Sequence, residues 1–551
     1  MCVYNRFMRH ISRSWFLAVL ACACAFAVII QIPQFLHLRD PRSQGIAVAL
    51  NSDEEVYLAR VEEALSGRPE QSSEAFIGDP ALRGSQPAIL ERLMGTVFAP
   101  TGWRAATVLQ IVDSVTVFFL FLSILWFLRQ SGFSRASSLS ATLLFCVIEL
   151  YNLNRPVHQA LSLLLLLTAL NLVIAGRERS VRWVIPGAVF LGLLFGDYFW
   201  TWSFGWLWVG LLILWECIEW MRTRRQSAQA VRLILCAAFG AIAAVPFLLQ
   251  LLGIMRDPLS QEAVFRSGMH PSHLPESWPY SILFAVMALG TGITVWKHPE
   301  KMRQYRYAVV TVFAAFIVIH QHLLHGLVFN FVSHYLLTLV LSAIIAVLLW
   351  HSIRSRVLLL SALAACVYLA AVAYDGRHVL RQFTVRDRFQ EQHFSTLLPV
   401  LDALPRATIL SDPETSSFIA GSTKHDIVYS LYLKNVLMQS EEIARRYCAT
   451  LLPLAAGDRH LHEGSPVYPD AVSAFKDDPS VRDREIAMVD AACAAADGDP
   501  GDVLRTFHVQ YVLWNEKYQL RWDLKRLNIP LTKAASGSGW SLWEVTGASP
   551  R

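Results

Sequence analysis

Long apolar runs recur through the first two thirds of the chain, and they constrain the fold more than any other feature of the sequence. Each run is about 15–23 residues long, and most therefore match the roughly 20 residues that a helix needs to cross a bilayer. Only 17% of the 551 residues are charged, against about a quarter in soluble domains. The sequence predicts a mostly α protein, a polytopic transmembrane helix bundle of about 11 spans. The predicted spans are 15–31, 106–128, 137–151, 157–175, 183–199, 203–220, 231–253, 279–296, 307–327, 334–350 and 357–374.

Lys and Arg residues are distributed unevenly between the two sides of these spans. Eighteen lie in the N-terminal tail and in alternate connections, and only three (Arg155, Arg256 and Arg266) lie in the short connections of the other side. Positive residues near span ends mark the cytoplasmic side of a membrane protein. The bias predicts a cytoplasmic N-terminus and an extracytoplasmic C-terminus, with the first run as an uncleaved span.

Two long segments fall on the outer side in this topology. The first extracytoplasmic loop, 32–105, belongs to a transmembrane domain of residues 1–374. Strong helix formers over 53–65 predict a helix that lies along the membrane surface, and a second helix is expected over 88–98. The other segment, 375–551, lacks long apolar runs and has an ordinary soluble composition. It predicts an extracytoplasmic α/β domain.

Short apolar stretches separated by turn residues indicate the elements of this C-terminal domain. Strands are expected at 407–410, 426–429, 509–514 and 540–545, and helices over 441–452 and 481–496. Ser411-Asp412-Pro413 predicts a strand-to-helix turn with a cap, which opens a further helix. Cys448 and Cys493 are the only cysteines in the domain. They form one disulfide in an oxidising compartment or remain two free thiols, and the sequence leaves both open.

Ionisable residues of the predicted spans gather towards the outer face. Most such residues face an aqueous or functional cavity, because burying a charge in lipid is costly. Only Glu216 and Glu219 lie towards the inner face, where neighbouring arginines are available as partners. The asymmetry predicts an outward-facing site rather than a path through the membrane. The outer group comprises Asp113, Glu149, His158, Asp197, His320, His322, His325 and His334.

Asp53 and Glu54 stand at the start of the first helix of the outer loop, and Tyr57 follows Asp53 one helical turn later. Carboxylates at a helix N-terminus are favoured by the helix macrodipole, which is the purely structural interpretation. The functional interpretation is a general base, which requires a carboxylate held beside the hydroxyl that it deprotonates. Both interpretations fit the sequence.

The order of these parts resembles the GT-C superfamily of membrane glycosyltransferases, which take sugars from polyprenyl-phosphate carriers. Protein O-mannosyltransferases and aminoarabinose transferases share this plan of one span, a large outer loop, a many-helix body and an outer C-terminal domain. The resemblance implies that Asp53, with Glu54 as the alternative, is the catalytic base. Ser333-His334-Tyr335 resembles the family's basic residue and tyrosine near the lipid phosphate, although His334 stands where Arg is usual.

The same resemblance implies a polyprenyl-phosphate-linked sugar as donor and a glycan, a lipid or a protein as acceptor. Membrane lipids would surround the spans, and the compact Arg-rich connections favour a bacterial cytoplasmic membrane, although an endoplasmic reticulum protein would show the same polarity. The expected substrate-binding residues are Tyr57, Asp113, His158, Asp197, His334 and Tyr335.

Two further assignments have structural alternatives. His322 and His325 are three residues apart and predict a divalent metal site, although histidines at a span end also sit simply at the headgroup level. Asp197 lies in an aromatic run and would hold a sugar hydroxyl while Trp200 or Trp202 stacks on the ring. An interfacial aromatic belt gives the same pattern.

Two other classes of function compete with a glycosyltransferase. A transporter or lipid flippase predicts ionisable residues near the bilayer midplane and two related halves, and the sequence has neither. A non-catalytic membrane assembly protein would tolerate the loss of Asp53. No basic block interleaved with aromatic residues indicates a nucleic-acid partner.

Overall fold

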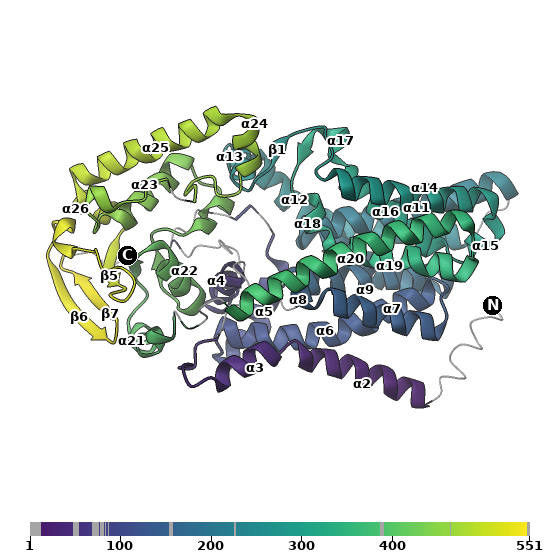
Figure 1. Ribbon diagram of the computed structural model, residues 1–551, viewed down its shortest axis with the longest axis horizontal. Helices are drawn as coiled ribbons and strands as arrows, with labels where there is room; N and C mark the ends of the chain where they lie inside the picture. The colour runs from purple at the N-terminus through teal and green to yellow at the C-terminus, as the bar shows by residue number, and fades with distance from the viewer. Residues whose placement is uncertain are drawn as a thin grey trace.

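The computed structural model describes residues 13–47, 54–68, 77, 82, 84–85, 87–153, 158–224, 228–385, 389, 391–462 and 464–547. A bundle of long helices forms one part of the molecule, and a smaller α/β domain covers one end of it (Figure 1). The end of the bundle that faces this domain is called the domain-side end below, and the other end is called the far end.

Each of the predicted apolar runs lies in helical structure. Among the described residues, eight helices are long and apolar enough to cross a membrane, and α2 with α3, bent by 42° at their junction, makes up to nine. The eight are α6 (Ala105–Gln130), α9 (His158–Glu178), α11 (Phe199–Thr223), α12 (Ala228–Arg256), α14 (Trp278–Lys297), α16 with α17 (Arg306–His325), α19 (Leu336–Ile353) and α20 (Arg356–Val385). The bent pair is α2 (Arg13–Ile29) with α3 (Ile32–Arg39).

Two predicted spans correspond to shorter helices. The third falls on α7 (Arg135–Ile148) and the fifth on Val181–Gly196, which contains α10 (Val184–Leu193). At 1.5 Å per residue, 14 residues extend about 21 Å, less than the roughly 30 Å of a bilayer core. The count of 11 spans therefore stays a prediction, while the 11 helical segments are present.

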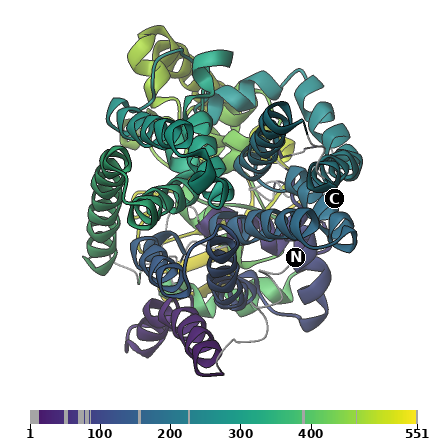
Figure 2. The ribbon, with the colours of Figure 1, turned by 90° about the vertical axis from the view of Figure 1, so that its right-hand side faces the viewer.

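Close contact between small residues brings the bundle helices together. A Cβ on Gly192 of α10 would lie 2.6 Å from the Cβ of Ala243 on α12, and one on Gly290 of α14 would lie 2.1 Å from the Ser361 hydroxyl of α20. Glycine has no side chain, so it lets two helices pack this closely. Close packing helps to hold membrane helices together, because burying apolar side chains gains little when the surrounding lipid is equally apolar. Seen along the bundle, the helices pack around a continuous apolar core to which α16 and α19 contribute strongly (Figure 2).

Carboxylates with ion-pair and hydrogen-bond partners occupy the far end of the bundle. Arg177 donates from Nε to Glu216 at 3.1 Å, and Tyr307 donates to Glu178 at 2.5 Å. Arg303 forms an ion pair with Glu219. The predicted pairing of Glu216 and Glu219 with arginines is confirmed.

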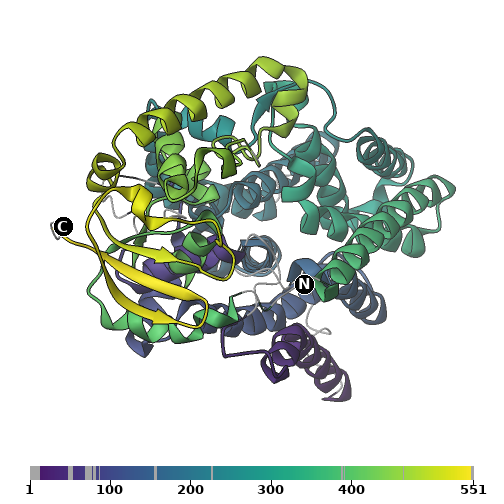
Figure 3. The same cartoon turned by 60° about the vertical axis from the view of Figure 1, so that its left-hand side comes forward.

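The two helices of the first outer loop lie between the bundle and the α/β domain (Figure 3). They are α4 (Glu54–Leu65) and α5 (Ile89–Phe98). A buried ion pair of 2.7 Å joins Arg60 of α4 to Glu91 of α5. On the other side, a Cβ on Gly421 of α22 would lie 3.0 Å from the Leu58 Cβ. Both the apolar and the charged face of α4 are largely covered by protein, while its predicted place on the membrane surface stays a prediction.

The C-terminal domain is built on a five-stranded mixed sheet. Its strand order is β4-β3-β5-β7-β6, with β4, β3 and β5 parallel and β7 antiparallel to both of its neighbours. The strands are β3 (Thr408–Leu410), β4 (Asp426–Ile427), β5 (Val509–Trp514), β6 (Leu531–Gly537) and β7 (Trp540–Val545). The principal helices are α21 (Leu398–Ala403), α22 (Pro413–Ser422), α23 (Ser440–Leu451), α24 (Val472–Asp477), α25 (Pro479–Gly498) and α26 (Pro500–Thr506).

Most of this domain agrees with the sequence-based expectation. Asp412 caps α22 as predicted, since its carboxylate accepts from the Thr415 N–H at 3.0 Å. Cys448 of α23 and Cys493 of α25 form a disulfide, which settles the alternative that the sequence left open. Strand β6 was not predicted.

Short elements complete the fold at the domain-side end. A two-stranded ribbon pairs His270 with Val328 and Pro271 with Leu327. The elements here are α8 (Leu150–Leu153), α13 (Ser260–Arg266), β1 (His270–Pro271), α17 (His322–His325), β2 (Leu327–Val328) and α18 (Phe331–His334), while α15 (Pro299–Arg303) lies at the far end.

Candidate functional site

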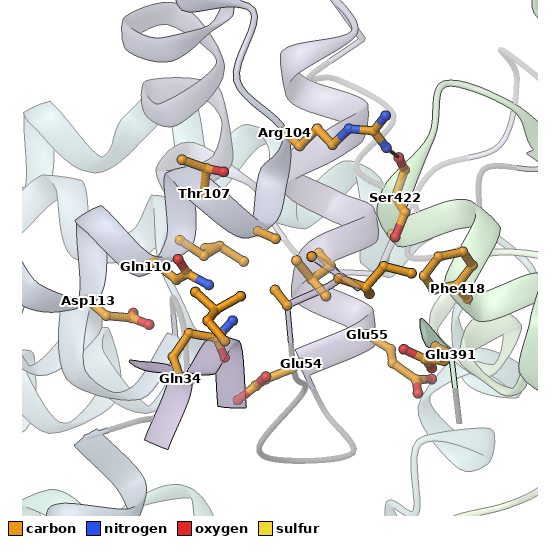
Figure 4. A pocket seen from close by; sticks show the side chains of 18 of the residues that line it. Gln34, Glu54, Glu55, Arg104, Thr107, Gln110, Asp113, Glu391, Phe418 and Ser422 are labelled. Carbon is orange, nitrogen blue, oxygen red and sulfur yellow. Dashed lines mark hydrogen bonds between the residues drawn. The ribbon is translucent and has the colours of Figure 1, made fainter. Parts of the chain in front are cut away.

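A cavity of about 300 Å³ lies where the bundle meets the C-terminal domain, and it is called the acidic cavity below. Helices α3, α4, α6 and α22 enclose it (Figure 4). Four carboxylates line it, and Arg104 is the one basic side chain among the described lining residues. The carboxylates are Glu54, Glu55, Asp113 and Glu391.

The walls of the acidic cavity are otherwise largely apolar. Ile30 and Leu38 from the first two helices, Leu109 from α6 and Phe418 from α22 contribute hydrocarbon surface. These apolar walls make the surroundings of the carboxylates less polar than bulk water. This combination of apolar walls with a few convergent polar groups is the usual make-up of a ligand site.

Glu54 is the first residue of α4 and its side chain is 8% exposed. Its place at the helix N-terminus stabilises the carboxylate form through the macrodipole, as the structural interpretation expects. The same side chain lines the acidic cavity, as the functional interpretation requires. Asp53, directly before it in the chain, lies outside the described residues.

Asp113 is the second predicted residue in the cavity. It lies on α6, eight residues after Ala105, so it sits about 12 Å along the span by helix geometry. Asp113 has no hydrogen bond or ion pair with the part of the chain that the structure describes. Figure 4 places Asp113, Gln34 and Gln110 on one side of the cavity, with Glu54 between them and Glu55.

Glu391 approaches the cavity from the segment that leads into the C-terminal domain. Burial, with a smaller contribution from the nearby Glu414 charge, raises its pKa to about 7. A carboxyl group with a pKa near neutrality can both accept and donate a proton in the same cycle. Glu391 was not predicted, because a single glutamate in a polar stretch carries no sequence pattern that distinguishes it.

Arg104 connects the bundle to the C-terminal domain beside the cavity. Its guanidinium donates to the Ser422 carbonyl at 2.8 Å and forms an ion pair with Asp402. Next to it, the Ala105 N–H donates to Glu62 at 2.9 Å, which ties α4 to the start of α6. Burial raises the pKa of Glu62. These contacts hold three walls of the cavity in one arrangement.

Tyr57 and Asp197 do not line the acidic cavity. Tyr57 packs against the apolar cluster that α4, α5 and α6 share. Asp197 is buried and accepts from Ser162 at 2.9 Å. His158 begins α9, and its side chain is outside the described part of the structure.

Trp200 and Trp202 are not placed to stack on a sugar in the acidic cavity. Trp200 is 1% exposed, and Trp202 stacks on Phe195 with ring centroids 4.9 Å apart. The interpretation of Asp197 with a stacking tryptophan is therefore not supported by the geometry.

His334 and Tyr335 form a separate aromatic cluster. His334 stacks on Phe329 at 4.8 Å, and Tyr335 is fully buried with its hydroxyl 2.5 Å from the Ser203 hydroxyl. Gln321 donates to the same Tyr335 oxygen at 3.1 Å. Neither residue lines the acidic cavity, so the structure does not bring them together with Glu54.

The histidines proposed for a metal do not converge. His322 is buried and its Nε2 lies 2.8 Å from the Leu274 carbonyl. His325 is exposed and its Nδ1 accepts from the Leu327 N–H at 3.2 Å. Among the described residues, no group of three or more His, Cys, Asp or Glu side chains is arranged to hold a metal ion. The expectation of a metal here has no support in the geometry.

Comparisons with known proteins give matches among solved structures alone. No protein-family model matches the chain, and no curated protein sequence does. Two crystal structures of ArnT from Cupriavidus metallidurans align with 98% of this chain and 100% of theirs. The form bound to undecaprenyl phosphate has 11% identity and a TM-score of 0.47, and the apo form has 13% and 0.49. Neither likeness by itself assigns a substrate to this chain.

Proposed function

We propose that this chain is a GT-C-like glycosyltransferase that moves a sugar from a polyprenyl-phosphate carrier to an acceptor on the outer face of the membrane. The observation that carries the proposal is the meeting of Glu54 and Asp113 in one cavity. One comes from the first outer loop and the other from the first long span after it. The transfer reaction requires a base in a cavity beside the membrane, and a carboxylate of that loop can serve as this base.

The composition of the cavity suits a donor with a lipid tail and a polar head. Apolar side chains of α3 and α6 line part of the cavity, and polar groups come from these helices, from α4 and from the side of the α/β domain. Arg104 is the cation available for a phosphate. Its pair with Asp402 is partly exposed, with 37% and 52% of the two side chains accessible, so a phosphate would displace it at little cost.

Glu54 and Asp113 have distinct roles in a single displacement. Glu54, or Asp53 beside it, takes the proton of an acceptor hydroxyl. The hydroxyl oxygen then forms a bond to the anomeric carbon, while the bond from that carbon to the phosphate oxygen breaks. Polyprenyl phosphate leaves with the electron pair, and the anomeric configuration inverts. Asp113 is placed to accept hydrogen bonds from sugar hydroxyls.

The location in the cell is part of the proposal. The arginine bias of the connections puts the far end of the bundle in the cytoplasm and the C-terminal domain outside. The Cys448–Cys493 disulfide supports this orientation, because such bonds persist in oxidising compartments. A bacterial cytoplasmic membrane, with the acceptor in the cell envelope, fits these features.

A comparison of lipid-linked sugars and surface glycans tests the proposal in cells. The strains carry the wild type, a deletion, Asp53→Asn or Glu54→Gln at matched protein levels. We expect the deletion and at least one variant to accumulate an unused lipid-linked sugar and to lose a glycan modification. If the deletion changes neither pool, the chain is not a glycosyltransferase. A deletion phenotype that both variants fully restore would instead indicate a non-catalytic assembly role or a transporter.

A further inference from the structure

A second cavity, of about 340 Å³, lies at the domain-side end of the bundle and is called the tyrosine cavity below. It is bounded by α8, α14, α18 and α20, and it shares no lining residue with the acidic cavity. The proposed transfer reaction uses none of its residues. The site is therefore independent of that proposal.

Hydrogen-bond acceptors and aromatic rings dominate the polar part of the tyrosine cavity. Glu276 and Asp375 bring carboxylates, and Tyr280 and Tyr368 meet edge to face with ring centroids 5.3 Å apart. None of the described lining residues is basic. Carboxylates and tyrosine faces together attract cations and repel anions.

Close to the tyrosine cavity, two buried side chains have polar atoms without a hydrogen-bond partner among the described residues, and one of them, Tyr368, lines the cavity. Tyr368 is 0% exposed, and its hydroxyl has no hydrogen-bond partner among the described residues. Glu149 interacts electrostatically with Tyr368, and it is also 0% exposed. Its Oε2 accepts from Asn152 at 2.7 Å, while its Oε1 has no partner in the described part of the chain.

One of the two carboxylates that line the tyrosine cavity already has a structural role. Glu276 accepts from the Val332 N–H at 3.2 Å, at the start of α18. Asp375 is exposed at the mouth, and the Tyr368 hydroxyl, which lines the cavity, has no hydrogen-bond partner among the described residues. A buried polar atom without a hydrogen bond is costly, so a ligand that donates to this oxygen would be retained.

We propose that the tyrosine cavity binds a primary ammonium group, carried either by a lipid headgroup or by a soluble amine. An ammonium offers three N–H donors, which match the Tyr368 hydroxyl, a carboxylate and one further oxygen. The adjacent face of α14 is open to lipid, with Trp278 61% and Ile282 57% exposed. The ammonium source is therefore either the surrounding bilayer or the outer solution.

Two arms of one experiment separate these sources. The full-length protein is placed in phosphatidylcholine nanodiscs, with or without phosphatidylethanolamine, and lipid retention is measured by native mass spectrometry. In the second arm, thermal unfolding in pure phosphatidylcholine discs is followed while ethanolamine is titrated. Choline (a cation without N–H donors) and ethylene glycol (uncharged) serve as matched probes. The variants are Tyr368→Phe and Asp375→Asn, with the exposed Tyr518→Phe as control.

We expect saturable binding of phosphatidylethanolamine, of ethanolamine or of both, weakened at least threefold by Tyr368→Phe and by Asp375→Asn but unchanged by Tyr518→Phe. Retention of the lipid alone identifies a headgroup, and a response to ethanolamine alone identifies a soluble amine. Equal binding of choline or ethylene glycol would overturn the assignment, because neither molecule carries an N–H donor. Absence of binding in both arms, or binding that both cavity variants leave intact, would also overturn it.

Discussion

The two ends of the helix bundle use the same residue type in opposite ways. At the far end, Glu216 and Glu219 are paired with arginines, and Glu178 accepts from Tyr307. At the domain-side end, Asp113 lines a cavity without a partner among the described residues, and burial raises the pKa of Glu391 to about 7. A paired carboxylate holds helices together, whereas an unpaired one in a cavity is available for chemistry.

The largest expected difference between the ends is in turnover. Glu54→Gln keeps the shape of the side chain and removes its basicity, so transfer should fall by about 10²–10⁴ if Glu54 is the base. Glu219→Gln at the far end, whose ion pair is partly exposed, should leave turnover unchanged. The measurement is the initial rate of sugar transfer by purified protein at saturating donor. A greater loss of rate in Glu219→Gln than in Glu54→Gln would reverse the roles assigned to the two ends.

Folding stability should show the opposite ranking. Glu216→Gln leaves Arg177 buried with one charge partner fewer, and removing one member of a buried pair costs about 3–5 kcal/mol. We expect the lower end of that range, because Glu178 still contacts Arg177. Thermal unfolding in detergent should show a clear fall in Tm for Glu216→Gln and little change for Glu54→Gln. Equal Tm values for the wild type and Glu216→Gln would show that the far-end network is not structural.

The disulfide provides a comparison within the C-terminal domain. Joining Cys448 to Cys493 closes a loop across 45 residues, and such a cross-link stabilises a domain by about 2–4 kcal/mol. The double variant Cys448→Ala with Cys493→Ala should unfold at lower temperature, and a reducing agent should no longer affect it. The exposed free thiol of Cys217 supplies the control variant Cys217→Ala. A wild type insensitive to reductant would argue against the bond.

The smallest expected effect is a pH dependence from Glu391. Its pKa is raised in the folded protein from an ordinary 4.5 to about 7, so the folded state holds a proton that the unfolded state releases between these values. Its stabilising contribution is therefore present at low pH and is lost as the pH rises through 7, by about 1–3 kcal/mol. Glu391→Gln should flatten the fall in Tm between pH 5 and pH 8.

A second variant sharpens the pH experiment. The charge of Glu414 adds to the pKa shift of Glu391, so Glu414→Gln should move the midpoint of the pH dependence to lower pH without removing it. If Glu391→Gln retains the full wild-type dependence, the titrating group lies elsewhere.

The sequence predicted the elements of the fold better than their placement. Apolar runs located the 11 helical segments, and Ser411-Asp412-Pro413 correctly indicated a capped helix. Strand β6 was missed because Leu531–Gly537 has small and polar residues and gains its structure only by pairing with β7 at the edge of the sheet. The sequence pattern of α4 did not reveal that α22 packs against it.

The site shows the same limit. Glu54 and Asp113 were predicted from position and type, and tertiary structure brings them to one cavity. His334 and Tyr335 resemble the family's local motif more clearly than the other site residues. They lie, however, in a separate aromatic cluster, where the Tyr335 hydroxyl forms a hydrogen bond with the Ser203 hydroxyl. Glu391 entered the cavity with no sequence signal at all. A short sequence motif does not show whether the helices that carry its residues lead to the same cavity. That depends on the tertiary arrangement of the helices.

The central claim, that the carboxylates heading the first outer loop perform the chemistry, is tested most directly by transfer with purified protein. The donor is the lipid-linked sugar that accumulates in a deletion strain, and the assay follows release of its polyprenyl phosphate. We predict that the wild type consumes this lipid and that the double variant Asp53→Asn with Glu54→Gln, folded and at the same concentration, does not. Release by the double variant at the wild-type rate would contradict the claim.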